Sequence, residues 1–81
     1  MGGFNTRVEY RGAAYIVQTQ DKGLAAQYVE SLIYKSGRLL TSRRTPYTSL
    51  LTRPDAKKLI ESLMEDQHKK ILEQIVDGTL D

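Results

Sequence analysis

A glutamate and the only histidine of the chain lie three residues apart in the stretch 65-EDQH-68. On a helix, this spacing puts a carboxylate and an imidazole on one face, as in the metal-binding helices of di-iron bundles. Such a site needs two copies of the motif and two more glutamates from facing helices. Glu61 lies one turn earlier, and a dimer could supply the second copy. A lone histidine on an acidic helix face is more often a surface residue or a polar spacer between helices. We therefore expect no metal and no other cofactor.

Other kinds of catalysis have few candidate residues. The chain has no cysteine, which excludes a thiolate nucleophile, a disulfide and a thiolate metal site. His68 is far in sequence from every serine in a turn, and Gly2-Gly3 does not follow a strand as a phosphate-binding loop would. We expect that the protein is not an enzyme.

The basic residues are concentrated in the first two thirds of the chain. Residues 1–53 carry eight Lys and Arg against three Asp and Glu, a net charge of +5, whereas residues 54–81 carry a net charge of −3. A basic half can bind a polyanion such as nucleic acid, or it can meet the acidic half of a second copy. The candidate polyanion-binding residues, expected on one face of a sheet, are Arg7, Lys35, Arg38 and Arg44.

Two β-hairpins are predicted in the first part of the chain. Residues 4–20 alternate between apolar and polar, and a turn at Arg11-Gly12 would place Val8 opposite Tyr15. Residues 28–45 are rich in strand-forming residues and are divided by a second turn at Ser36-Gly37. The register that follows for this second hairpin pairs Tyr34 with Leu39, Leu32 with Thr41, and Glu30 with Arg43.

A long helix is predicted over residues 53–77. Thr52 is a suitable N-cap residue, Pro54 is tolerated in the first turn, and Gly78 is a stop signal. Apolar residues recur in adjacent pairs every four residues, and the pair Gln67-His68 interrupts them. The alternative is a helix that ends or kinks at this polar pair and folds back.

These elements predict a single α+β domain over residues 1–81. A four-stranded antiparallel sheet made of two β-hairpins (residues 4–47) is packed by one long C-terminal helix. The expected core consists of Phe4, Val8, Tyr15, Val17, Leu32, Tyr34, Leu39, Leu59, Ile60 and Leu63.

The predicted helix is longer than the sheet on which it lies. About 24 helical residues span ~36 Å, whereas strands of six or seven residues span ~20–24 Å. The last turns would project into solvent and expose aliphatic side chains, which a second copy could cover. We therefore expect a homodimer with an interface formed by Met64, Ile71, Leu72, Ile75 and Val76.

The chain resembles a group of small, uncharacterised bacterial proteins. The similarity rests on 4-FNTRVEYRGAAYIVQTQDKG-23, 32-LIYKSGRLLTSRRTPY-47 and 64-MEDQH-68, and it covers nearly the whole chain. It implies a complete bacterial domain, and it implies no activity and no functional residue.

The expected function is that of a small, non-enzymatic protein-interaction module that acts as a homodimer. Its partner would be a second copy or another protein, and the alternative is nucleic-acid or other polyanion binding through the basic sheet face. The sequence has no secretory h-region, and no apolar run approaches ~18 residues. We therefore expect a cytoplasmic protein without a membrane partner.

Overall fold

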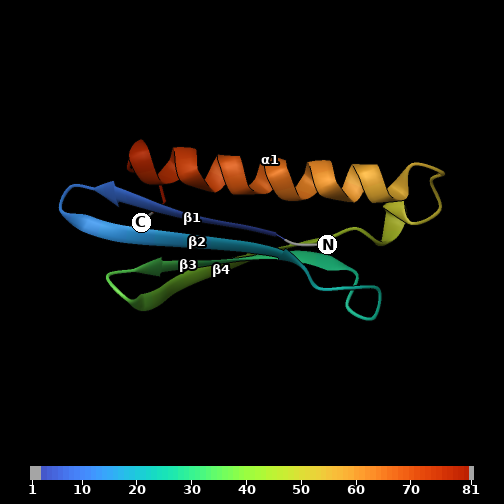
Figure 1. Ribbon diagram of the computed structural model, residues 1–81, viewed down its shortest axis with the longest axis horizontal. Helices are drawn as coiled ribbons and strands as arrows, with labels where there is room; N and C mark the ends of the chain where they lie inside the picture. Colours follow the sequence, from blue (N-terminus) through green and yellow to red (C-terminus); the bar gives the residue numbers. More distant parts are fainter. Residues whose placement is uncertain (1–2, 81) are drawn as a thin grey trace.

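The computed structural model describes residues 3–80, which form one sheet and one long helix (Figure 1). In chain order the elements are β1 (Gly3–Tyr10), β2 (Ala13–Asp21), β3 (Tyr28–Lys35), β4 (Arg38–Pro46), the short 3-10 helix η1 (Thr48–Leu50) and α1 (Ala56–Val76). The strands are antiparallel and adjacent in the order β1-β2-β3-β4. Helix α1 lies across one face of the sheet (Figure 1), and we call the other face the open face. The predicted α+β fold is confirmed.

The first hairpin has the predicted register. Val8 lies opposite Tyr15, and the two turn residues, Arg11 and Gly12, have φ of 53° and 82°. Positive φ at both central residues is typical of a two-residue turn whose twist matches that of the strands. Glycine adopts this conformation without strain, whereas an arginine does so only rarely.

The second hairpin departs from its predicted register after one pair. Tyr34 lies opposite Leu39 as expected, but an irregularity between Ile33 and Tyr34 inserts an extra residue, Leu40, into β4. Such a β-bulge shifts every later pair by one residue and exchanges the two faces of the strand. The resulting pairs are Leu32 with Ser42, Ser31 with Arg43, and Glu30 with Arg44. The predicted pairing of Glu30 with Arg43 is therefore wrong.

The core contains a different set of β3 residues from the expected set. Val29, Ser31 and Ile33 are fully buried beneath α1, because β2 and β3 pair Val17 with Ile33. Leu32 and Tyr34 belong to the opposite parity and lie half-buried on the open face, next to an exposed Leu39. Tyr15, Val17 and Ile60 are buried as expected, whereas Phe4 is 39% exposed.

Helix α1 and the sheet are matched in length, which contradicts the expected overhang. The helix starts at Ala56, and its N-cap residue is Asp55 instead of the expected Thr52. It runs without interruption to Val76. Its 21 residues span ~32 Å. The strands have eight or nine residues, which corresponds to ~26–30 Å.

The helix end is consequently packed on the sheet of its own chain. Met64, Ile71 and Ile75 are at most 2% exposed. These three residues of the expected dimer interface belong to the core and are not available to a partner. Leu72 is half-buried and Val76 is 54% exposed, so these two remain accessible.

A polar pair on α1 separates two apolar clusters. The first cluster consists of Tyr15, Val17, Ile33, Ile71 and Ile75, and the second of Val29, Tyr47, Ile60 and Met64. Between them on the helix stand Gln67 and His68, which are 8% and 5% exposed. His68 was expected on the surface or between helices, but it lies between the helix and the sheet.

Hydroxyl groups of the sheet satisfy this polar pair. The two ring nitrogens of His68 lie 2.8 Å from the Thr6 hydroxyl and 2.7 Å from the Thr19 hydroxyl. The Thr19 hydroxyl is also 2.7 Å from that of Ser31, which accepts a hydrogen bond from the Gln67 amide. No buried side-chain nitrogen or oxygen in residues 3–80 lacks a partner.

Candidate interaction surface

His68 and its hydroxyl partners form a structural network. Burial lowers the pKa of His68, so the ring is neutral at neutral pH, and both of its nitrogens are engaged. The Phe4 ring lies 5.4 Å from the imidazole, centroid to centroid. Buried polar networks of this kind fix one arrangement of a core when every member is satisfied.

The carboxylate that precedes His68 by three residues does not join it. Glu65 is exposed and pairs with Lys69, 3.6 Å away and one turn along the helix. Among residues 3–80, no three His, Asp or Glu side chains are placed to hold a metal ion together. The Glu-x-x-His spacing therefore places its two residues in different environments.

The four candidate polyanion-binding residues do not form one patch. Arg7 pairs with Glu9 on β1 at 3.0 Å, and Arg44 pairs with Glu30 at 2.9 Å at the opposite edge of the sheet. Lys35 lies on the helix side of the sheet, with its ammonium 5.6 Å from the centre of the Tyr15 ring. Arg38 lies beside the second turn and is exposed.

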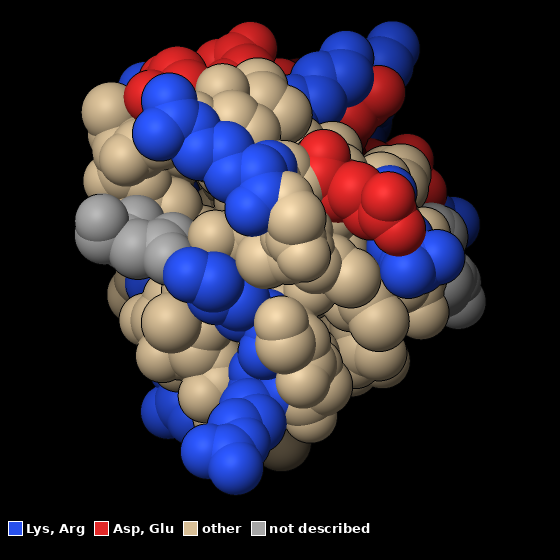
Figure 2. Space-filling model, turned by 90° about the vertical axis from the view of Figure 1, so that its left-hand side faces the viewer, with Lys and Arg blue, Asp and Glu red and all other residues tan. Residues whose placement is uncertain are grey.

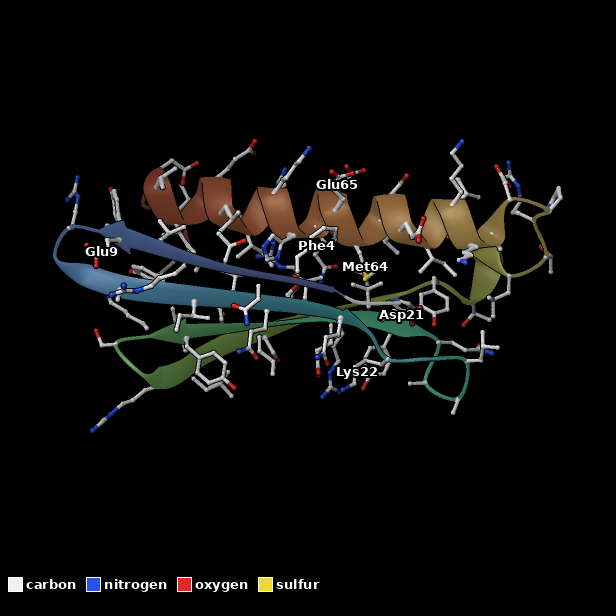
Figure 3. The ribbon with its side chains drawn as sticks, viewed as in Figure 1. Phe4, Glu9, Asp21, Lys22, Met64 and Glu65 are labelled. Atoms are coloured by element: carbon white, nitrogen blue, oxygen red, sulfur yellow. The ribbon has the colours of Figure 1, made fainter. Side chains whose placement is uncertain are left out.

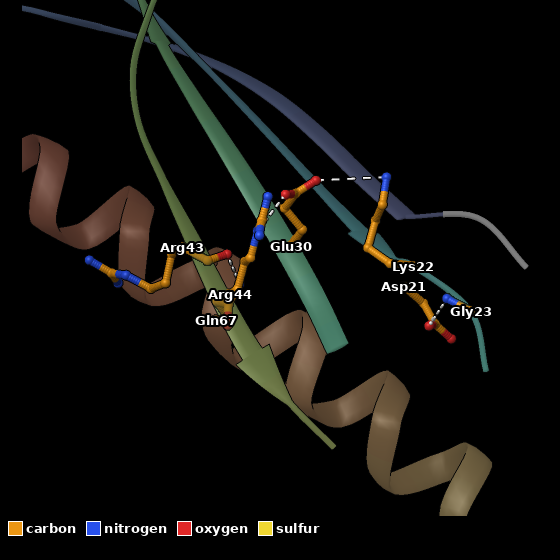
Figure 4. Close-up of polar contacts among 7 residues, drawn as sticks. All are labelled: Asp21, Lys22, Gly23, Glu30, Arg43, Arg44 and Gln67. Atoms are coloured by element: carbon orange, nitrogen blue, oxygen red, sulfur yellow. Dashed lines mark hydrogen bonds and ion pairs between the residues drawn. The ribbon is translucent and has the colours of Figure 1, made fainter. Parts of the chain in front are cut away.

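The register shift exchanges the positions of Arg43 and Arg44 in the sheet. Each of these arginines forms a salt bridge or a hydrogen bond with another side chain. Figure 4 shows Arg44 and Lys22 on either side of Glu30, whereas Arg43 approaches Gln67 through its carbonyl group. The Arg43 guanidinium donates a hydrogen bond to Gln74 on α1. At the end of the molecule that carries the two hairpin turns, acidic side chains lie among basic ones on the upper part of the surface, and basic side chains alone continue to its lower edge (Figure 2).

The two edge strands of the sheet differ in how they are protected. Strand β4 contains the bulge, two adjacent arginines and a terminal Pro46. Bulges, charged side chains and prolines are the usual devices that keep an edge strand from pairing with another chain. Strand β1 has eight residues in unbroken register with β2 and no proline, and its charged residues are Arg7 and Glu9, which pair with each other. Strand β1 is therefore the less protected of the two edges.

The hydrogen-bonding pattern of the first hairpin shows which residues of β1 direct their backbone groups toward the free edge. Tyr10 and Ala13 flank the two-residue turn and form its closing hydrogen-bonded pair. Because antiparallel pairs alternate along a strand, Val8 and Thr6 also direct their backbone groups toward β2. Arg7 and Glu9 direct theirs toward the free edge, and their exposed side chains lie on the open face.

Apolar side chains flank this edge on the helix side. Leu72 packs against the same cluster as Val8, and Val76 follows one turn later on α1. At the other end of β1, Phe4 lies between β1 and α1, beneath Glu65 and near Met64 (Figure 3), in a groove of about 450 Å³. We call the edge of β1, together with Phe4, Leu72 and Val76, the β1 flank.

Sequence reasoning missed both the hydroxyl network and the β1 flank. The signal for the network was present, because Thr6 and Thr19 occupy core-facing positions of strands whose helix partner carries Gln67-His68. The signal for the flank was the contrast between β1, which has no proline, and β4, which ends in Pro46 after two adjacent arginines.

Comparisons with protein-family models, with curated proteins and with solved structures gave no match. Within residues 3–80, no helix has the length and apolar character needed to cross a membrane.

Proposed function

We propose that this chain is a small, non-enzymatic protein-interaction module that acts as a homodimer, with the β1 flank as its contact surface. The observation that carries the proposal is the asymmetry of the two sheet edges. The β4 edge has a bulge and a proline, two devices against strand addition, and the β1 edge has neither.

The β1 flank combines polar and apolar contributions to association. The outward N–H and C=O groups of Arg7 and Glu9 offer backbone hydrogen bonds to an added strand. Burial of Phe4, Leu72 and Val76, which are partly or largely exposed, adds apolar area at ~25 cal/mol per Å² before the cost of association is subtracted. Contacts of this extent belong to the smaller specific interfaces, so the dimer should dissociate on dilution.

A proline scan of the two edges tests the contact surface. Arg7→Pro removes an outward N–H from β1, and Arg44→Pro removes one from β4, since Arg44 lies between hydrogen-bonded pairs of the β3-β4 ladder. Both changes also remove an arginine and a surface ion pair, which makes them matched variants. Light scattering and sedimentation velocity, from micromolar to millimolar protein, should show a dimer for the wild type and for Arg44→Pro and a monomer for Arg7→Pro.

Circular dichroism and thermal melts must show that both proline variants are folded. A wild-type protein that remains monomeric at millimolar concentration refutes the proposal. Loss of the dimer in Leu32→Lys, with Arg7→Pro still dimeric, would move the interface to the open face. Val76→Lys is the corresponding substitution on the helix side and should weaken the dimer.

A further inference from the structure

We infer that the two copies pair their β1 strands about a two-fold axis at Val8, which would produce one continuous eight-stranded sheet. The inference rests on the proposed function and names the register of its contact. Antiparallel pairing across a two-fold axis perpendicular to the sheet leaves both helices on the same face.

The charges of β1 select this register. With the axis at Val8, Arg7 lies opposite the partner's Glu9, and Glu9 lies opposite the partner's Arg7. Both are outward-facing residues, so each such pair can exchange two backbone hydrogen bonds. Opposite charges directly across a sheet are favourable and like charges are unfavourable. Arg7 and Glu9 already form an ion pair within one strand, and their side chains are 64% and 71% exposed. Such an exposed pair is weak, so it competes only weakly with the ion pairs across the axis.

The neighbouring registers lack this complementarity. An axis at Arg7 or at Glu9 places that residue opposite its own copy, which brings like charges together. An axis at Thr6 places Arg7 opposite the partner's Asn5 and Glu9 opposite the partner's Gly3, with no charge pair at all.

The helix side of the sheet agrees with an axis at Val8. The two Val8 side chains would then meet in a pair that is not hydrogen-bonded, the closer of the two pair types, with a Cα separation of ~4.5 Å. Leu72 packs on the same cluster as Val8, and it lies one helical turn after His68, whose ring contacts Thr6 of β1. Leu72 and Val76 of the two helices would therefore face each other across the axis and shield each other from solvent.

Charge reversal followed by mixing tests the register. Arg7→Glu carries two acidic residues at the axis and Glu9→Arg carries two basic ones, so each variant alone should dimerise roughly ten-fold more weakly than the wild type. An equimolar mixture should restore association as a heterodimer, because every cross-strand pair again joins opposite charges. The double variant R7E/E9R should dimerise like the wild type. No gain of association on mixing would overturn the register.

Single cysteines give an independent measurement, since the natural chain has none. Under mild oxidation Val8→Cys should form a disulfide-linked dimer rapidly, whereas Thr6→Cys should not, because Thr6 lies opposite the partner's Tyr10. Cross-linking of Thr6→Cys alone would show a β1 dimer in another register, which refutes this inference and leaves the proposed function intact. A protein that neither cross-links nor dimerises refutes both.

Discussion

Acidification below about pH 6.5 should destabilise the fold through His68. The Gln67 amide donates to Ser31, whose hydroxyl lies 2.7 Å from that of Thr19. A neutral ring has one nitrogen that donates and one that accepts, so one of the Thr6 and Thr19 hydroxyls donates to His68 and the other accepts from it. A second proton makes both ring nitrogens donors, so the hydroxyl that donated to the ring must turn away from it. Protonation thus disturbs a buried network whose members are otherwise all satisfied.

The sign and size of this effect follow from linkage. Burial lowers the pKa of His68 below its ordinary value of 6.5, so the unfolded chain takes up this proton at a higher pH than the folded protein. The stability that the neutral ring contributes is complete above pH ~6.5 and is lost as the pH falls from there through the lower pKa of the folded state. Between the two pKa values the free energy of unfolding should fall by up to ~1.4 kcal/mol per pH unit.

Urea unfolding followed by circular dichroism between about pH 8 and pH 5 measures this slope. His68→Gln provides the comparison, because glutamine can donate and accept hydrogen bonds but does not titrate. The pKa of Asp77 is lowered by hydrogen bonds from the Thr79 hydroxyl and N–H, so its titration lies below this range. The slope should be present in the wild type and absent from His68→Gln. Equal slopes in both proteins, or a wild type that gains stability on acidification, would refute the reasoning.

Three substitutions test other parts of the packing, each by the change in the free energy of unfolding in urea. Thr19→Val should cost ~2–4 kcal/mol, because it leaves His68 and a neighbouring hydroxyl without a buried partner; a change under ~1 kcal/mol contradicts the network. Arg44→Ala should cost less than ~1 kcal/mol, since the guanidinium that pairs with Glu30 is largely exposed. Ile71→Asp should prevent folding, because Ile71 is 0% exposed in the core; a folded variant would place this residue at a surface.

The sequence predicted those elements whose local signals agree with each other. Around Arg11-Gly12, the alternation of apolar residues on both sides of the turn permits one register only, and the structure has it. Leu59 to Val76 carry a strong helical period, and the helix predicted over residues 53–77 is observed over Ala56–Val76, three residues shorter at its start and one at its end.

The remaining errors concern features that a one-strand pattern does not encode. Strand β3 has apolar residues at both parities, so only its pairing with β2 decides that Ile33 and not Leu32 enters the core. The bulge at Leu40 is an insertion with no mark in the sequence, and it exchanges the roles of Arg43 and Arg44. The expected helix overhang rests on strands of six or seven residues and a helix of about 24, whereas the strands have eight or nine residues and the helix 21, so Ile71 and Ile75 lie over the sheet.

The polar pair on α1 connects the fold to the proposed contact surface, because it fixes where the helix lies along the sheet. A shift of α1 by one turn would place Met64 or Ile71 over the hydroxyls of Thr19 and Ser31. It would also bury the amide and imidazole of Gln67-His68 among aliphatic side chains. Each buried polar group left without a partner costs ~1–3 kcal/mol, whereas the apolar residues exchanged are similar in size. Uniform apolar residues along the helix would allow such a shift at lower cost, and Leu72 would then no longer stand beside Val8. Under the proposed function, the buried network would thus contribute to recognition without touching a partner, since it holds the helix side of the β1 flank in register with its edge.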